Sequence, residues 1–161
     1  MPKDSSGIKI IAKNPLAYQN FIIEEKLEAG IALLGTEIKS LRQQSPNLRD
    51  SYVHFSKKGE RIEAILENAH IPHYSHGNLN NHDPMRKRKL LLNKRELNRL
   101  YGALTQKGMT IVPTQIYLKN GRAKVQIGVG KGKKRHDKRE TLKQKTADME
   151  MAKAMKRRGR S

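Results

Sequence analysis

The sequence contains no cysteine among its 161 residues. This absence excludes disulfide bonds, thiolate nucleophiles and cysteine-based zinc sites, and it is compatible with a reducing compartment. No apolar run approaches the roughly 18 residues that a membrane span requires. The N-terminal segment MPKDSSGIKIIAKNP also lacks the apolar core of a signal peptide. We therefore expect a soluble cytoplasmic protein.

Aromatic and acidic side chains are scarce. Phe, Tyr and Trp together make up 4% of the chain, so few rings are present on which single-stranded bases could stack. Acidic residues number 15 against 34 Lys and Arg, which gives a formal charge of +19. A field of this size attracts polyanions, of which nucleic acid is the commonest. An anionic membrane is the alternative, but the residues after 139 offer too few bulky apolar side chains for one membrane-binding face.

The excess positive charge is unevenly distributed. Residues 131–161 carry 13 of the 34 basic side chains and 4 of the 15 acidic ones. The stretch GVGKGKKRHDKR at 128–139 joins a glycine-rich segment to the start of this basic region. We therefore divide the chain into a flexible N-terminal arm at 1–15, a compact body at 16–130 and a basic C-terminal tail at 131–161. Because the tail lacks an apolar stripe, we expect it to be disordered alone and helical on its polyanion.

The body shows strand patterns and one clear helix pattern. Residues 19–27 and 31–34 are strand-like on either side of a bend at Ala29-Gly30, and Gly35 is expected in a sharply bent strand. Residues 36–42 fit either a helical turn or an extension of that strand. A capping-box pair, Asn93 and Glu96, precedes apolar residues at helical spacing, which predicts a helix that ends before Gly108.

Two β-hairpins are also expected. The first spans residues 53–66 and turns at 57–59. The second turns at Asn120-Gly121, a pair typical of the type I′ turn. Counting outward without interruption pairs Lys119 with Arg122, Thr114 with Ile127 and Val112 with Val129, and Pro113 indicates an edge or a bulge. Strands with one capping helix predict a mainly β fold, an OB-like closed or partly open barrel, with a β-sandwich as the alternative.

Patterns for catalysis and metal binding are weak. Three glutamates cluster between positions 24 and 28, but no nucleophile or base accompanies them. Histidines at 70, 73 and 76 lie in a loop-like segment without a carboxylate at ligand spacing before Asp83. The run GVGKGK at 128–133 lacks the spacing of a phosphate-binding loop. We therefore predict that the chain is not an enzyme and has no metal site and no cofactor.

Three basic groups stand out, at Arg86–Lys89, Lys131–Arg139 and Lys153–Arg160. Basic side chains in such groups neutralise phosphates and thereby dominate affinity for nucleic acids. Since aromatic residues are few, recognition of the shape and backbone of folded RNA fits better than stacking of a single strand.

Four sequence blocks carry a family resemblance: FIIEEKLEAGIALLGTEIKSLR (21–42), LRDSYV (48–53), HDPMRKRKLLLNKRELNRLYG (82–102) and GKGKKRHDKRE (130–140). In this order they resemble the family of small protein B, the SsrA-binding (tmRNA-binding) proteins of bacterial trans-translation. The resemblance implies an OB-type barrel that binds the tRNA-like domain of tmRNA in place of a missing anticodon arm. It also implies a tail that enters the 16S rRNA decoding centre and the empty mRNA channel of a stalled ribosome, so that the unfinished product is tagged for degradation.

The same resemblance, together with the basic groups, predicts the contact residues of a monomeric protein. Glu28 would accept hydrogen bonds from a base edge or a ribose hydroxyl, unless it pairs with a nearby Lys or Arg. Leu91 would pack on an unstacked base, unless it belongs to the core. His136 would stack on a decoding-centre base and Asp137 would cap a tail helix. The predicted tmRNA-contacting residues are Asn14, Glu28, Arg86, Lys87, Arg88, Lys89, Leu91, Asn93, Lys124, Lys131, Lys133 and Lys134. The predicted ribosome-contacting residues are Gly132, His136, Asp137, Lys138, Arg139, Lys153, Lys156, Arg157 and Arg158.

Two other classes of function remain open on composition alone. One is a structural ribosomal protein with a basic tail, and the other is a membrane-surface adaptor. The Asp137-Lys138-Arg139 motif and the block from His82 to Leu92 favour the tmRNA-binding factor over both.

Overall fold

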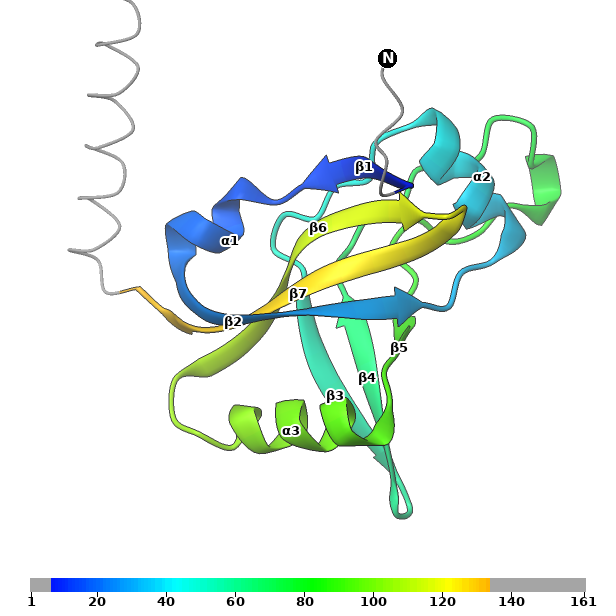
Figure 1. Cartoon of the computed structure of the whole chain (residues 1–161). Coiled ribbons are helices and arrows are strands. Elements are labelled where there is room, and N and C mark those ends of the chain that lie inside the picture. Colours follow the sequence, from blue (N-terminus) through cyan, green and yellow to red (C-terminus); the bar gives the residue numbers. More distant parts are fainter. Residues whose placement is uncertain (1–6, 134–161) are drawn as a thin grey trace, which may run out of the picture.

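The structure, a computed structural model, describes residues 7–133 (Figure 1). Its elements in chain order are β1 (Ile8–Lys13), α1 (Pro15–Asn20), β2 (Phe21–Ile31), α2 (Gly35–Gln43), β3 (Tyr52–Lys58), β4 (Arg61–Glu67), the 3₁₀ turn η1 (Asn78–Asn80), β5 (Arg88–Leu91), α3 (Lys94–Leu104), β6 (Met109–Lys119) and β7 (Arg122–Gly132). The prediction of a mainly β fold with few helices is therefore confirmed.

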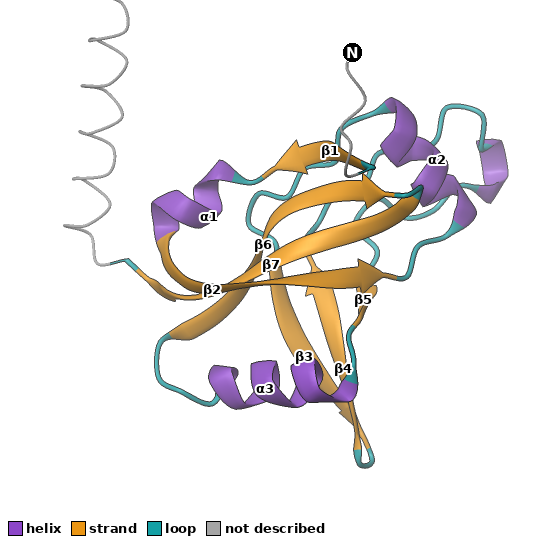
Figure 2. Ribbon diagram, viewed as in Figure 1, coloured by secondary structure: helices purple, strands orange, loops and turns teal. Residues whose placement is uncertain are grey.

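The strands form one antiparallel sheet that closes on itself. The hydrogen-bonded order is β1-β6-β3-β4-β5-β2-β7, and β7 also pairs with β6 to complete a barrel (Figure 2). Two seams are short: β3 meets β6 at the Val53–Ile111 pair, and β5 meets β2 at two residue pairs. Strand β1 lies along the part of β6 that β3 leaves unpaired. The barrel is thus closed by long strands on one side and by narrow contacts on the other.

The core fills the barrel with alternating side chains from every long strand. Leu66, Ile111, Val125 and Ile127 are fully buried there. Helix α3 covers one end of the barrel and contributes the buried Leu100, while α2 lies near the opposite end (Figure 1). The predicted N-cap is present, since Asn93 Oδ1 accepts a hydrogen bond from the Glu96 amide at 2.8 Å. The capping helix expected from the sequence is therefore confirmed.

Three local expectations differ from the structure. Residues 8–13, assigned to a flexible arm, form β1, which pairs with β6 while Ile11 and Ala12 pack against the core. The expected bend at Ala29-Gly30 is absent, because β2 continues as one strand to Ile31. Gly35 begins α2 rather than lying in a bent strand, and the Glu37 side chain accepts a hydrogen bond from the Leu34 amide at that helix start.

The β6–β7 hairpin has the predicted turn but not the full predicted register. Asn120 and Gly121 both have positive φ angles, 51° and 81°, as the type I′ turn requires. A bulge between Pro113 and Gln115 then shifts the pairing, so that Pro113 faces Ile127 and Ile111 faces Val129. Proline has no amide hydrogen for the ladder, and a bulge is where a strand tolerates it. The predicted pairs Thr114–Ile127 and Val112–Val129 are therefore wrong by one residue.

Candidate nucleic-acid interface

A row of side chains crosses the outer face of four neighbouring strands. Gly30 of β2 lies opposite Leu91 of β5 on one side and opposite Lys124 of β7 on the other, and Lys124 lies opposite Tyr117 of β6. Paired residues of antiparallel strands point to the same face of a sheet. Glu28, two residues before Gly30, shares that face. We call these five residues the interface row.

Leu91 lies exposed on this face because Gly30 leaves room for it. A Cβ atom added to Gly30 would lie 3.1 Å from Leu91 Cβ and 3.5 Å from its Cδ1. The Leu91 side chain is 52% exposed, whereas its neighbour Leu90 is buried in the core. The sequence left two interpretations of Leu91 open, a base contact or a place in the hydrophobic core. The exposure of its side chain excludes the place in the core.

Glu28 is held in place by Tyr117, which lies on the same face of the sheet. The buried Tyr117 hydroxyl donates a hydrogen bond to Glu28 Oε2, and Lys119 Nζ lies 3.5 Å from Oε1. The Tyr117 hydrogen bond lowers the pKa of the Glu28 carboxyl; partial burial opposes this, and Lys119 and Lys124 reinforce it. Burial and the adjacent carboxylate raise the pKa of Tyr117. At neutral pH, Glu28 is thus an oriented anionic acceptor on a basic protein, suited to base amino groups or ribose hydroxyls.

Replacing Tyr117 by phenylalanine is expected to raise the pKa of Glu28 toward its ordinary value of 4.5, since the largest stabilising contact of the carboxylate is removed. A carboxyl-carbon NMR titration of the two proteins measures this directly. Tyr101→Phe is the matched control, because that ring packs edge-on against Phe55, 5.5 Å away, and not against Glu28. An unchanged Glu28 titration in Tyr117→Phe would show that the hydroxyl does not fix the carboxylate.

The two lysines of the segment around β5 each face a glutamate of β4. Lys87 Nζ lies 3.6 Å from Glu67, and Lys89 Nζ lies 3.5 Å from Glu63. Both lysine side chains remain half-exposed or more, at 66% and 50%. Surface ion pairs of this kind contribute roughly 0–1 kcal/mol to the free energy of folding. Each lysine can therefore exchange its carboxylate partner for an RNA phosphate at little cost.

Arg88 is not on the surface, which corrects its prediction as a phosphate-binding residue. Its side chain is fully buried, and its guanidinium donates to Glu37 Oε2 at 2.5 Å and to the carbonyls of Ala69 and Pro84. Arg86 occupies the other Glu37 oxygen at 2.5 Å and the Ala32 carbonyl at 3.2 Å. Within β5, strand alternation places Arg88 inward and Lys89 outward, whereas Arg86 precedes the strand and stays 33% exposed while it reaches Glu37. We call Glu37, Arg86 and Arg88 the buried arginine clasp.

Asn14 is also buried, at 5% exposure, which corrects its prediction as a surface contact. Its Nδ2 donates to the carbonyls of Pro113 at 2.9 Å and Leu48 at 3.2 Å. Asn14 therefore ties the end of β1 to β6 and to the segment before β3. Asn93 is exposed but caps α3 through the Glu96 amide.

The remaining predicted residues lie at or beyond the end of β7. Lys131 is exposed and lies opposite Ile22 and Met109, and the Lys133 amide donates to the Asn20 carbonyl at 2.8 Å. Strand β7 extends to Gly132, so the body continues beyond the expected boundary at residue 130. The following predicted contacts lie outside the described residues: Lys134, His136, Asp137, Lys138, Arg139, Lys153, Lys156, Arg157 and Arg158.

The sequence reasoning missed Tyr117 and Lys119 as parts of the site. The alternation of the β6–β7 hairpin puts Tyr117 on the same face as Lys124, but a contact to Glu28, 89 positions away, requires knowledge of the strand order. Between residues 7 and 133, no group of three or more His, Asp or Glu side chains is arranged to hold a metal ion. In the same part of the chain, no helix has the length and apolar character needed to cross a membrane.

Comparison with known proteins identifies relatives over nearly the full chain. The model of the "SmpB protein" family matches residues 11–157. An SsrA-binding protein of Geobacillus sp. (strain WCH70) is 50% identical over 158 residues, covering 98% of each chain. An SsrA-binding protein of Lactobacillus gasseri is 54% identical over 142 residues, covering 88% of this chain and 91% of the relative.

Among solved structures, one described as "tmRNA-SmpB: a journey to the center of the bacterial ribosome" contains a similar chain. It superposes with a TM-score of 0.65 at 44% sequence identity, covering 83% of this chain and 95% of that one. Family model, relatives and solved structure agree with the resemblance carried by the four sequence blocks. The chain belongs to the SmpB family.

Proposed function

We propose that this chain is the RNA-binding factor of bacterial trans-translation. In this role it binds the tRNA-like domain of tmRNA, brings it to stalled ribosomes, and allows the unfinished product to be tagged for degradation. It acts in the cytoplasm as a monomer and by binding alone, without catalysis. The observation that carries the proposal is the interface row, which places an oriented carboxylate, an exposed leucine and a lysine on one sheet face of an SmpB-family barrel.

Each residue of the row has a distinct role in this proposal. Lys124 and the exposed Lys131 neutralise phosphates along the RNA backbone, helped by Lys87 and Lys89 at the edge of β5. Leu91 packs against the face of an unstacked base. Glu28 accepts hydrogen bonds from a base edge or a 2′-hydroxyl, and it thereby supplies selectivity that positive charge alone does not give. The names of the relatives, which are SsrA-binding proteins, support RNA as the ligand.

The basic residues after Lys133 have a separate role. We assign Gly132 and the segment from His136 to Arg139 to the decoding centre, and the basic group that includes Lys153, Lys156, Arg157 and Arg158 to the empty mRNA channel. High positive charge suits both sites, since each is lined by RNA phosphates. The solved structure that contains a similar chain, described as "tmRNA-SmpB: a journey to the center of the bacterial ribosome", supports the ribosome as a partner.

A gel-shift comparison tests the proposal. Residues 1–133 and the full chain are each titrated onto the tRNA-like domain of tmRNA at about physiological salt, with ordinary tRNA as competitor. We expect both proteins to bind tightly and to resist the competitor, because the recognising residues lie in the barrel. Binding by the full chain only, and equally to either RNA, would indicate a charge-driven basic protein and would favour the structural ribosomal class instead.

A further inference from the structure

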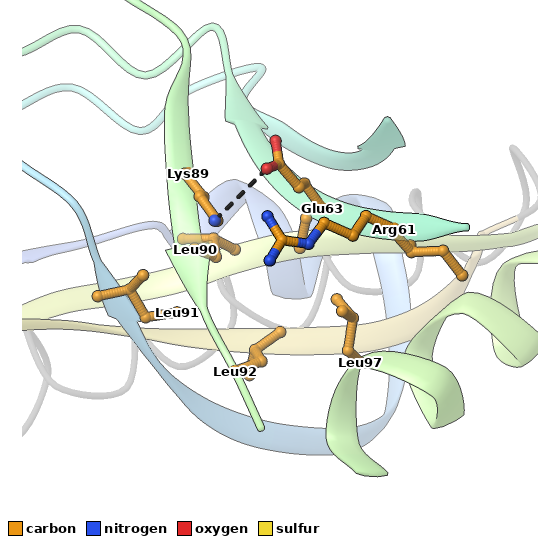
Figure 3. Close-up of a pocket in the computed structure, with 9 residues that line it drawn as sticks. Arg61, Glu63, Lys89, Leu90, Leu91, Leu92 and Leu97 are labelled. Carbon is orange, nitrogen blue, oxygen red and sulfur yellow. Dashed lines mark ion pairs between the residues drawn. The ribbon is translucent and has the colours of Figure 1, made fainter. Parts of the chain in front are cut away.

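A hollow of about 510 Å³ lies beside the interface row, between the tip of the β3–β4 hairpin, β5 and the start of α3 (Figure 3). Its volume falls in the range of roughly 300–1,000 Å³ that is typical of small-molecule sites. The lining residues are Arg61, Ile62, Glu63, Ala64, Lys89, Leu90, Leu91, Leu92 and Leu97. Leu91 therefore belongs both to the interface row and to the wall of this hollow.

The inner part of the hollow is apolar. Ala64 and Leu90 form a buried floor, at 1% and 2% exposure. Leu92 and Leu97 are only partly buried, although they pack against the core. In Figure 3 the side chain of Leu91 comes from the last residue of β5, that of Leu92 from the next position, and that of Leu97 from the first turns of α3. A flat apolar ring placed here would cover leucine surface that is now exposed to water.

The rim of the hollow is polar and carries both kinds of hydrogen-bonding group. Arg61 is exposed at the start of β4, and its side chain extends toward β5 in Figure 3. Glu63 supplies carboxylate oxygens and lies 3.5 Å from Lys89 Nζ. An arginine plane stacks on bases, a carboxylate accepts from base amino groups, and a lysine neutralises a phosphate. Together these groups can contact the ring, the amino group and the phosphate of one unstacked nucleotide.

We infer that this hollow holds one unstacked nucleobase of the bound RNA, the ring lying against Leu92 and Leu97 and the Arg61 guanidinium covering it from the rim. The inference rests on the proposed function and extends it to residues outside the interface row. It follows from two features: Leu91 makes the hollow continuous with the row, and Arg61 and Lys89 give its rim the charge that attracts a polyanion. Arg61, Glu63, Leu92 and Leu97 then become contact residues.

Arg61→Ala and Lys58→Ala are a matched pair that tests the inference. The two residues lie opposite each other across the hairpin end, so each change removes one positive charge from nearly the same place, but only Arg61 lines the hollow. We expect Arg61→Ala to weaken binding to the tRNA-like domain about 10-fold, because the base loses the guanidinium plane that covers it. We expect Lys58→Ala to change the affinity about twofold or less, because Lys58 does not line the hollow and an exposed charge is screened by salt.

An abasic scan of the RNA identifies the base and keeps the test independent of charge. Each unpaired nucleotide is replaced in turn by an abasic one, and binding is measured with native protein and both variants. We expect one position whose loss weakens native and Lys58→Ala binding but has little further effect in Arg61→Ala. If every abasic penalty is the same in all three proteins, the hollow holds no base. That result leaves the proposed function standing, whereas failure of the native protein to prefer this RNA over tRNA overturns both.

Discussion

Replacing Glu37 by glutamine is expected to reduce the free energy of unfolding by about 3–5 kcal/mol. Glu37 is fully buried and accepts hydrogen bonds from Arg88, Arg86 and the Leu34 amide. The change leaves the buried Arg88 guanidinium without its counter-charge, and an uncompensated buried charge is among the costliest single defects. Since small domains are stable by only about 5–15 kcal/mol, this loss would be a large share of the total.

Urea denaturation of three proteins measures this effect. Glu63→Gln is the control, because its partner Lys89 is half-exposed and the pair is worth no more than about 1 kcal/mol. The double variant Glu37→Gln, Arg88→Met removes both buried charges and should recover much of the stability lost in Glu37→Gln. A Glu37→Gln protein that unfolds at the same urea concentration as Glu63→Gln would contradict the role given to the buried arginine clasp.

The dependence of the unfolding free energy on pH also tests the buried arginine clasp, because Glu37 titrates at acid pH. Burial raises the pKa of Glu37, but the hydrogen bonds from Arg86, Leu34 and Arg88 together outweigh it and hold the pKa below 4.5. The folded carboxyl thus has a lower pKa than the unfolded one. Its contribution to stability is present above pH 4.5 and is lost as the pH falls through the lower, folded value. The unfolding free energy of Glu37→Gln should lack this acid-dependent part.

Ending the chain after Lys133 is expected to abolish tagging of stalled products while leaving the fold intact. The last strand finishes at Gly132, so all strand pairs of the barrel are kept, and we expect the unfolding free energy to change by about 0.5 kcal/mol or less. In the proposed function the removed residues act on the ribosome, so affinity for the tRNA-like domain should stay nearly unchanged. A reconstituted trans-translation reaction measures tagging, and thermal unfolding measures the fold.

The position of the cut matters for this experiment. A chain ending at residue 130 loses Lys131 and Gly132, which pair with Ile22 and Phe21 of β2. We expect that shorter protein to be less stable than the one ending at Lys133, and it serves as the control for damage to the barrel. Tagging that persists at native rates without residues 134–161 would contradict the assignment of the tail to the ribosome.

Much of the fold follows from local sequence patterns, because local forces decide those elements. The Asn93 cap and the Asn120-Gly121 turn depend on residues close in the chain, and both were predicted correctly. The bulge after Pro113 was indicated, but its effect on register was not, since a slip of one residue depends on packing against β2. The start of α2 was missed because its Glu37 side chain is stabilised by arginines 49 and 51 positions away.

In the candidate site, too, the sequence predicted the positions of some residues correctly and those of others wrongly. Glu28, Leu91 and Lys124 were predicted, and the structure places them on one sheet face. Asn14 was predicted as a contact from the family resemblance, and Arg88 from that resemblance and its place in the basic group at 86–89, but both side chains are buried. The run Arg86 to Lys89 is basic at every position, so its pattern does not indicate which alternate residues point inward. That choice depends on the buried Glu37, which lies on a different element.

The pairing of β2 with β7 affects how the protein forms during its own synthesis. Leu27 lies opposite Ile127, a partner 100 positions later, whereas β3 and β4 are joined by a tight turn. Contacts between distant positions form slowly, and a growing chain adds its last strand only at the end. A nascent chain interrupted before residue 122 therefore leaves β2 without its longest partner and the barrel open along that edge. Unfinished copies of this protein would expose unpaired backbone and be readily degraded or aggregated.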